Sequence, residues 1–313
     1  MNRVAVDRQG WRKCRDCRIQ IAAVCAAGWL LSFAESACAQ TASDRIDFGA
    51  GENAMIASLT NDGFSTTVGR AVVHLPRDAM PADEARAIAT ELNEGIEAIE
   101  AFTRSPRAWQ RDPARIDYYF HPSQFISYAR PAFALVFVSL SRLQSGSAPL
   151  LHETAHVLLS PSTDFVLARG ARFDMEHDGP VWLIEGIATY VAMSVSKSAG
   201  VPEGDPLNVG RLEQLDRRCA TALDTPVGAE VLPFIGVVGA PEALGSVERR
   251  PIVGPAFYAC AASFNKYLAG RIGADALIQL MAAKDAQARF EKLTGRSVTA
   301  LRADWRRQIG SLP

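Results

Sequence analysis

The sequence predicts an α+β fold with two lobes, a strand-containing amino-terminal lobe and a mostly helical carboxy-terminal lobe. The first half of the chain mixes one long helical repeat of apolar residues with short runs rich in β-branched and aromatic residues. The second half consists mainly of apolar segments with helical spacing. With 48% hydrophobic residues in 313, the chain can bury a sizeable core. A formal net charge of −1 and the lack of a basic run argue against nucleic acid as a partner.

Residues 1–39 are predicted to be a secretory signal peptide. Six basic and two acidic residues precede an apolar run of fifteen residues, and Ala37-Cys38-Ala39 offers a small-residue cleavage site. The run is shorter than the ~20 residues that a membrane-spanning helix needs. We therefore expect cleavage after Ala39 and a secreted or periplasmic protein without a stable membrane span. An uncleaved anchor is the alternative, and the oligomeric state is not predicted.

The amino-terminal lobe is assigned to residues 40–160, after a short flexible leader at 41–47. Pro81 suits the start of its long amphipathic helix, and Pro161 closes its last one. The predicted elements are a strand or hairpin arm (64–75), a helix (82–102), two strands (115–120 and 134–140), a turn (145–147) and a helix (148–159).

The carboxy-terminal lobe, residues 161–313, is predicted to be mostly helical. Its helices are expected at 181–197, 209–223, 255–269, 274–282 and 298–309. The segment 160–180 is long for a plain loop and is a candidate lid with a small hairpin at 166–173, and the sequence leaves open whether it gates the cleft. His177 in this segment has an open role, whereas His74 and His121 are expected to be ordinary surface or packing residues.

Cysteine usage fits an exported protein. Four of the six cysteines lie in the segment predicted to be removed, which leaves Cys219 and Cys260. An even pair in an oxidising compartment favours one disulfide. Two separate buried thiols are the alternative that the sequence leaves open.

The most informative motif is His152-Glu153-Thr154-Ala155-His156, an H-E-x-x-H inside the last predicted helix of the amino-terminal lobe. Residues i and i+4 share a helix face, with Cβ atoms about 5–6 Å apart, so the two imidazoles can bind one ion. Zinc accepts histidine nitrogen at roughly 2.0–2.1 Å and, in catalytic sites, keeps one position for water. Glu153 lies about 100° further around the axis and can face that open position. The spacing predicts a zinc site with Glu153 as a general base.

Glu185 is the candidate third ligand. It lies in a second apolar helical segment, between Trp182-Leu183-Ile184 and Gly186-Ile187, where a solvated carboxylate is not expected. A buried carboxylate needs a partner, and a cation satisfies that need. The alternative for Glu185 is a carboxylate that stabilises the start of a helix.

The H-E-x-x-H motif followed by W-L-x-E-G-x-A-x-Y, from Trp182 to Tyr190, resembles the gluzincin-type zinc metallopeptidases, the thermolysin-like clan. The resemblance spans roughly residues 132–283. It implies a small zincin-like fold with a mixed sheet and the zinc helix in the amino-terminal lobe. It also implies one Zn²⁺ per chain, held by His152, His156 and Glu185, and a peptide or protein substrate.

The chain departs from this group at two places. Thermolysin-like members carry an aspartate four residues after the third ligand, which hydrogen-bonds a zinc histidine, whereas this chain has Thr189. We therefore expect the support of that histidine to come from elsewhere in the chain. The G-x-M-E-N segment of the zinc aminopeptidases has no match upstream of His152, which favours an endopeptidase.

The resemblance also suggests where a substrate would contact the protein. The strand at 134–140 would form the rim of the cleft and pair with an extended peptide, although a buried central strand is the alternative. Tyr258 is the candidate donor to the oxyanion, with Tyr190 and Tyr267 as rivals. The expected function is an exported zinc peptidase. The alternative is a catalytically inactive, zinc-stabilised binding or scaffold protein of the cell envelope.

Overall fold

The computed structural model describes residues 51–124, 126–162, 180–196, 212–237, 239–283 and 285–311. All of these lie in one compact unit, Asp47–Pro313. The predicted signal peptide, the leader at 41–47, the hairpin at 166–173 and His177 lie outside the described residues. No helix among the described residues is long and apolar enough to cross a membrane.

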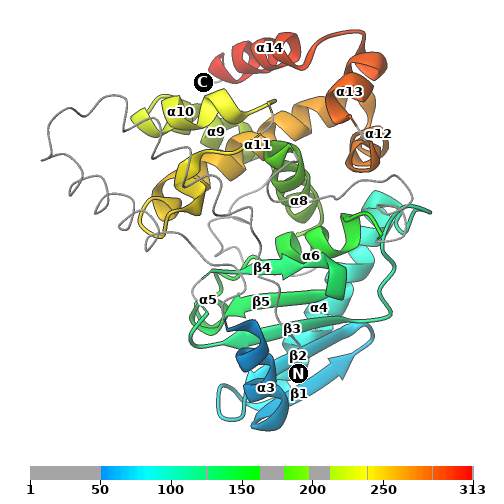
Figure 1. Ribbon diagram of the computed structural model, residues 1–313, viewed down its shortest axis with the longest axis vertical. Coiled ribbons are helices and arrows are strands. Elements are labelled where there is room, and N and C mark those ends of the chain that lie inside the picture. The colour runs from blue at the N-terminus through cyan, green and yellow to red at the C-terminus, as the bar shows by residue number, and fades with distance from the viewer. Residues whose placement is uncertain are drawn as a thin grey trace, which may run out of the picture. The chain divides into compact units, whose positions relative to one another are not determined.

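The first half of the described chain forms a mixed five-stranded sheet with helices on both faces (Figure 1). Its elements are α3 (Glu52–Asn61), β1 (Gly63–Val68), β2 (Ala71–Pro76), α4 (Ala82–Thr103), β3 (Ile116–His121), β4 (Tyr128–Arg130), the 3₁₀ turn η1 (Pro131–Phe133), β5 (Leu135–Ser139), α5 (Leu140–Gln144) and α6 (Leu150–Leu159). The α+β class expected from the sequence is confirmed.

The strand order is β1-β2-β3-β5-β4. Strands β1 and β2 form an antiparallel hairpin, β2, β3 and β5 run parallel, and β4 pairs antiparallel to β5. The predicted strand at 134–140 is therefore not the rim of the sheet, because β5 has a partner on each side. The edge of the sheet next to β5 is β4. The sequence does not predict this strand, because three residues are too few to show an alternating pattern.

Each face of the sheet buries a different set of side chains, as expected where successive residues of a strand point to opposite sides. Val73, Tyr118 and Val136 point to the main core, which they share with apolar residues of α4 and α6. Tyr119 and Phe137 point the other way and pack with residues of α3. The face that carries α6 thus presents the predicted zinc helix on a rigid platform.

The second half is helical, as predicted, and is organised around one long helix, α11. Its elements are α8 (Val181–Val195), η2 (Leu212–Gln214), α9 (Leu215–Leu223), α10 (Pro226–Val231), η3 (Leu232–Phe234), η4 (Glu242–Gly245), α11 (Arg250–Ile272), α12 (Ala274–Gln279), η5 (Leu280–Ala282), α13 (Ala286–Thr294) and α14 (Val298–Gly310). Helix α8 packs against both α6 and α11 and so joins the two halves (Figure 1).

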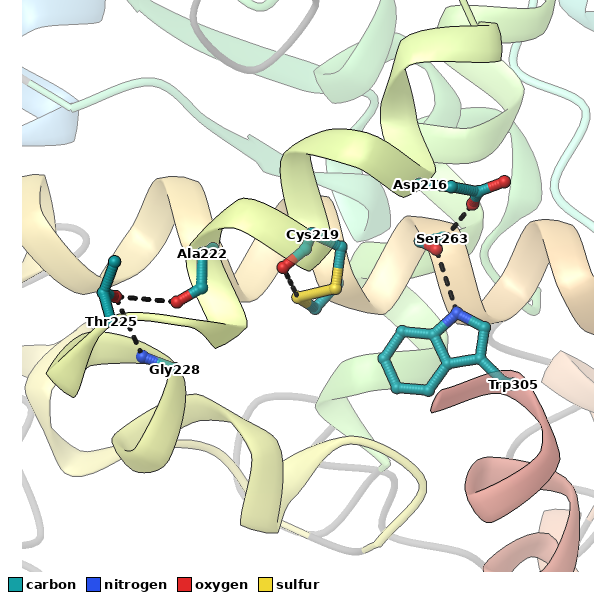
Figure 2. The surroundings of a disulfide bond; sticks show 8 residues. Asp216, Cys219, Ala222, Thr225, Gly228, Ser263 and Trp305 are labelled. Atoms are coloured by element: carbon teal, nitrogen blue, oxygen red, sulfur yellow. Dashed lines mark hydrogen bonds between the residues drawn. A yellow bond between two sulfur atoms is a disulfide. The ribbon is translucent and has the colours of Figure 1, made fainter. Parts of the chain in front are cut away.

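A disulfide between Cys219 and Cys260 joins α9 to α11 (Figure 2). Three residues further along α11, Ser263 donates a hydrogen bond of 2.7 Å to Asp216 and accepts one of 2.9 Å from Trp305. The structure thus resolves the choice that the sequence left open, in favour of the bonded pair. The disulfide and the hydrogen bonds together fasten α9 and α14 to the central helix.

Helix α11 begins at Arg250, more than a turn before the predicted start at Pro255. Proline has no N–H group, so a proline usually marks a helix end or its first turn. Here the turn before it still forms, because the backbone N–H of Val253 donates to the carbonyl of Arg249 and the Val253 side chain is fully buried. The added turn brings Arg250 into the helix that also carries Tyr258.

Candidate metal centre

Helix α6 carries His152, Glu153 and His156 and is fixed to the sheet by a buried hydrogen bond. The hydroxyl groups of Tyr118 on β3 and Thr154 on α6 lie 2.8 Å apart. Thr154 occupies one of the two variable positions of the H-E-x-x-H motif, so this bond sets the rotation of the helix. The imidazoles consequently face α8 rather than the sheet.

Helix α8 brings Glu185 to the same point, and at the next residue, Gly186, it packs closely against α11. A Cβ atom added at Gly186 would lie 2.1 Å from the amide nitrogen of Asn265 and 2.6 Å from the carbonyl oxygen of Ala261. Asn265 in turn donates a 3.1 Å hydrogen bond to the carbonyl of Trp182. The glycine after the glutamate is therefore required by helix packing.

The three predicted ligands converge on one point. The Nε2 atoms of His152 and His156 lie 3.0 Å apart, and Oε2 of Glu185 lies 3.2 Å from the first and 3.3 Å from the second. An ion with tetrahedral ligands at 2.0–2.1 Å separates its ligand atoms by about 3.3–3.4 Å. Each Nε2 carries only one proton or one lone pair, so hydrogen bonds alone cannot align all three contacts. Among the described residues, this cluster is the group able to hold a metal ion.

The charges in the cluster depend on one another. Burial alone would raise the pKa of Glu185, but the charge of His156 and hydrogen bonds from both imidazoles outweigh burial and hold that pKa below its usual range. Burial would lower the pKa of His156, but the Glu185 carboxylate outweighs it and raises that pKa. Without a metal, these two pKa shifts favour an ion pair between a His156 imidazolium and the Glu185 carboxylate. With a metal, the cation takes the place of the imidazolium proton.

Thr189 supports the histidine ligand, which corrects the expectation that this support comes from elsewhere. Its Oγ1 lies 3.1 Å from Nδ1 of His152, and the two residues are 2% and 3% exposed. When Nε2 faces a metal, Nδ1 carries the proton and the hydroxyl accepts it. Threonine fills the role because it lies one helical turn after Glu185, on the face of α8 that points to the cluster.

Glu153 is 4% exposed and lies beside the ligands without being one of them. Burial raises the pKa of its carboxyl group, and the charge of Glu185 raises it further, while both imidazoles and Arg250 act in the opposite direction. A raised pKa makes the carboxylate a stronger base, which suits a group that accepts a proton.

Tyr258 is the predicted tyrosine that reaches the cluster. Its ring packs edge-on against His152, with centroids 5.8 Å apart. The rivals pack elsewhere: Tyr190 lies against Phe102, and Tyr267 stacks on Phe264. The tyrosine hydroxyl accepts a 2.6 Å hydrogen bond from Arg250.

Sequence reasoning missed two residues of this site, Thr189 and Arg250. The signal for Thr189 is its position one helical turn after Glu185, from which a hydroxyl can reach an imidazole of the cluster. The sequence gives no signal for Arg250, because it lies before the predicted helix start at Pro255, whereas α11 begins at Arg250. His74, expected to be a surface or packing residue, is a packing residue, buried and hydrogen-bonded to Ser65 and Asp117.

No family model and no curated protein sequence matches the chain. The chemistry of the site therefore rests on its own residues and distances.

Proposed function

We propose that the protein is a zinc-dependent peptidase with a gluzincin-like fold. The observation that carries the proposal is the convergence of His152, His156 and Glu185 within 3.0–3.3 Å, next to a buried glutamate that no ligand role requires. Two neutral imidazoles and one carboxylate are a donor set that zinc accepts in catalytic sites. Glu153 supplies the base that hydrolysis needs and a purely structural zinc site does not.

A bound zinc ion would supply Lewis acidity, which lowers the pKa of a water molecule from about 15.7 toward ~7 and polarises a peptide carbonyl. Glu153 would accept a proton from the attacking water while the water oxygen forms a bond to the carbonyl carbon. The same carboxyl group then delivers the proton to the amide nitrogen as the C–N bond breaks. The products are a carboxylic acid and an amine. Tyr258 donates a hydrogen bond to the carbonyl oxygen when it becomes an oxyanion.

Strand β4 is the place for an extended substrate. It contacts α6, and within the described residues no strand pairs with its outer edge. A peptide added there would form main-chain hydrogen bonds along the strand. Arg130 donates a 2.7 Å hydrogen bond to Glu52, and Tyr128 donates one of 2.9 Å to the same carboxylate. Two side chains of β4 are thus hydrogen-bonded to the first residue of α3. Because pairing with the edge of β4 does not require a substrate terminus, it suits the middle of a peptide and favours endopeptidase activity.

The proposed location is outside the cytoplasm. The disulfide between Cys219 and Cys260 forms and persists in oxidising compartments. This agrees with the signal peptide predicted for residues 1–39. The substrate is a peptide or protein that meets the enzyme after export.

The proposal is tested first by metal content. Elemental mass spectrometry of the purified protein should give close to one zinc per chain, and Glu185→Ala should lose most of it. No zinc in the wild type, even after zinc is offered and excess removed, would refute the enzyme proposal.

Glu153→Gln then separates catalysis from metal binding. It should keep the zinc and lose turnover of a peptide library by about 10²–10⁴-fold, since the general base is gone. Glu94→Gln, an exposed position on α4, makes the same chemical change away from the site and serves as the control. Equal cleavage by Glu153→Gln and the wild type would refute the mechanism. Zinc without any cleavage by the wild type would favour the binding or scaffold role.

A further inference from the structure

Arg250 lies at the start of α11, eight residues before Tyr258, and its guanidinium group reaches that tyrosine. Nη2 donates a 2.6 Å hydrogen bond to the Tyr258 hydroxyl, and Nη1 donates a 2.9 Å hydrogen bond to the carbonyl of Leu244. Side chains of a helix point back toward its amino terminus, so a tyrosine and an arginine two turns earlier can meet. Two hydrogen bonds in different directions fix the guanidinium plane.

The Tyr258 ring reaches Arg250 across Gly254, where an added Cβ atom would make only ordinary van der Waals contacts. This glycine lies between the two residues on the same helix, and a Cβ atom added there would lie 3.4 Å from the Tyr258 ring and 3.7 Å from Cγ of Arg250. The ring therefore lies directly over the glycine, along the path to the arginine. The Arg250 charge lies 5.8 Å from the centre of the ring.

The direction of the hydrogen bond decides what Tyr258 can do. A guanidinium group has only donors, so in this pair the phenol oxygen must accept. The hydroxyl proton of Tyr258 is then left for a different acceptor. The ring packs edge-on against His152, which places this tyrosine beside the candidate metal cluster.

The charge of the arginine has a second effect. A cation bonded to the phenol oxygen makes the hydroxyl a stronger donor.

We propose that Arg250 is the positioning residue of the oxyanion donor: it binds the Tyr258 oxygen and directs the tyrosine hydroxyl toward the carbonyl oxygen of the substrate. This inference rests on the proposed peptidase function and adds to it a residue outside the H-E-x-x-H and E-G-x-A segments. Arg250 acts through Tyr258 and does not itself contact the reacting atoms.

The test is a double-mutant cycle on the full chain with zinc bound. Tyr258→Phe should lower kcat about 10²–10³-fold, as expected for the loss of one oxyanion donor. Arg250→Met should lower kcat about 10- to 100-fold with little change in KM, because the donor is present but misplaced. Arg250→Met in the Tyr258→Phe background should cost nothing further. Arg250→Lys should recover part of the activity.

The matched control is Arg249→Met. Arg249 precedes Arg250 in the chain, is half exposed and pairs with Glu230 at 2.5 Å. Its loss removes the same charge from the same region without touching Tyr258, so kcat should stay at the wild-type value. Zinc content and melting temperature show that each variant is folded and loaded.

Two results would overturn the proposal. If Arg250→Met costs the same factor with and without the Tyr258 hydroxyl, the arginine acts independently. If it raises KM alone, and most for substrates with a carboxylate near the scissile bond, it binds substrate.

A failure of the proposed function would look different, because the wild type itself would show no turnover. In that case, binding of a phosphinic peptide, whose tetrahedral anion mimics the oxyanion, decides the role of the pair. Weaker binding by both single variants, without a further loss in the double variant, would support the pairing. Unchanged binding by Arg250→Met would refute it.

Discussion

Replacing Thr189 by valine replaces one hydroxyl group at the candidate metal centre with a methyl group. Valine has nearly the same shape as threonine, and the site is 2% exposed, so neither a cavity nor a new water site is expected. What is lost is the acceptor that lies 3.1 Å from Nδ1 of His152. The variant therefore isolates the hydrogen bond that supports a histidine ligand.

The cost should fall on the metal-bound state. Without metal, His152 can place its single proton on Nε2, toward Glu185 at 3.2 Å, and then has no orphaned N–H. With metal, Nε2 must be bare and the proton is forced onto Nδ1, where valine offers no acceptor. A buried unsatisfied donor costs about 1–3 kcal/mol. This corresponds to a 5- to 150-fold loss, close to the ~10–100-fold typical of residues that orient metal ligands.

The assay is competition for zinc between the protein and a chelator of known affinity. We expect Thr189→Val to bind zinc about 10- to 100-fold more weakly than the wild type. Thr189→Ser keeps the hydroxyl and should stay close to the wild type. Thr103→Val makes the same substitution at a buried threonine of α4, whose hydroxyl donates to the carbonyl of Ile99 away from the cluster, and should reduce stability but not zinc affinity. Wild-type zinc affinity in folded Thr189→Val would refute the role assigned to this hydroxyl.

Three other predictions concern packing, covalent linkage and pH. Gly186→Ala should destabilise the protein by about 1–3 kcal/mol or more in urea unfolding, because the added methyl group meets the backbone of α11; an unchanged midpoint would contradict the packing explanation. Replacing both Cys219 and Cys260 by serine should cost about 4 kcal/mol, the closure entropy of a loop of 41 residues, again read from unfolding midpoints. A loss below about 1 kcal/mol would show that the linkage constrains little. The pKa of His156 is raised above 6.5 in the metal-free fold, so its contribution to stability is complete below pH 6.5 and disappears as the pH rises through the raised pKa. The pKa of Glu185 is lowered below 4.5, so its contribution is complete above pH 4.5 and disappears as the pH falls. Melting curves recorded in a chelator should show that the ion pair stabilises the protein most between pH 4.5 and pH 6.5. Zinc affinity, by contrast, should rise with pH as His156 loses its proton. A melting temperature of the metal-free protein that does not change across either pH value would contradict the ion pair.

Local patterns predicted the elements whose signal is repeated over many residues. The helix at 82–102 and the terminal helix at 298–309 lie within two residues of α4 and α14, because each has a sustained apolar face. The short elements α3, α10 and β4 were missed, since three to ten residues carry too few repeats to separate a pattern from chance.

Helix starts were less predictable where two rules compete. At α11, the rule that proline ends or begins a helix favoured Pro255. The burial of Val253 extends the helix back to Arg250, because burying an apolar side chain outweighs one missing hydrogen bond. This difference decided whether Arg250 could be recognised as a partner of Tyr258.

The sequence alone determined the chemical types of the candidate centre. His152, Glu153 and His156 are four residues or fewer apart, so the geometry of a single helix turn fixes their relation. Glu185 could be predicted as the third ligand because a charged side chain in an apolar segment needs a partner. The tertiary structure decided the distances between α6 and α8, the choice of Tyr258 over its rivals, and the contacts of Thr189 and Arg250. These depend on how closely helices approach one another, which is set by side-chain packing between residues far apart in the chain and leaves no local pattern.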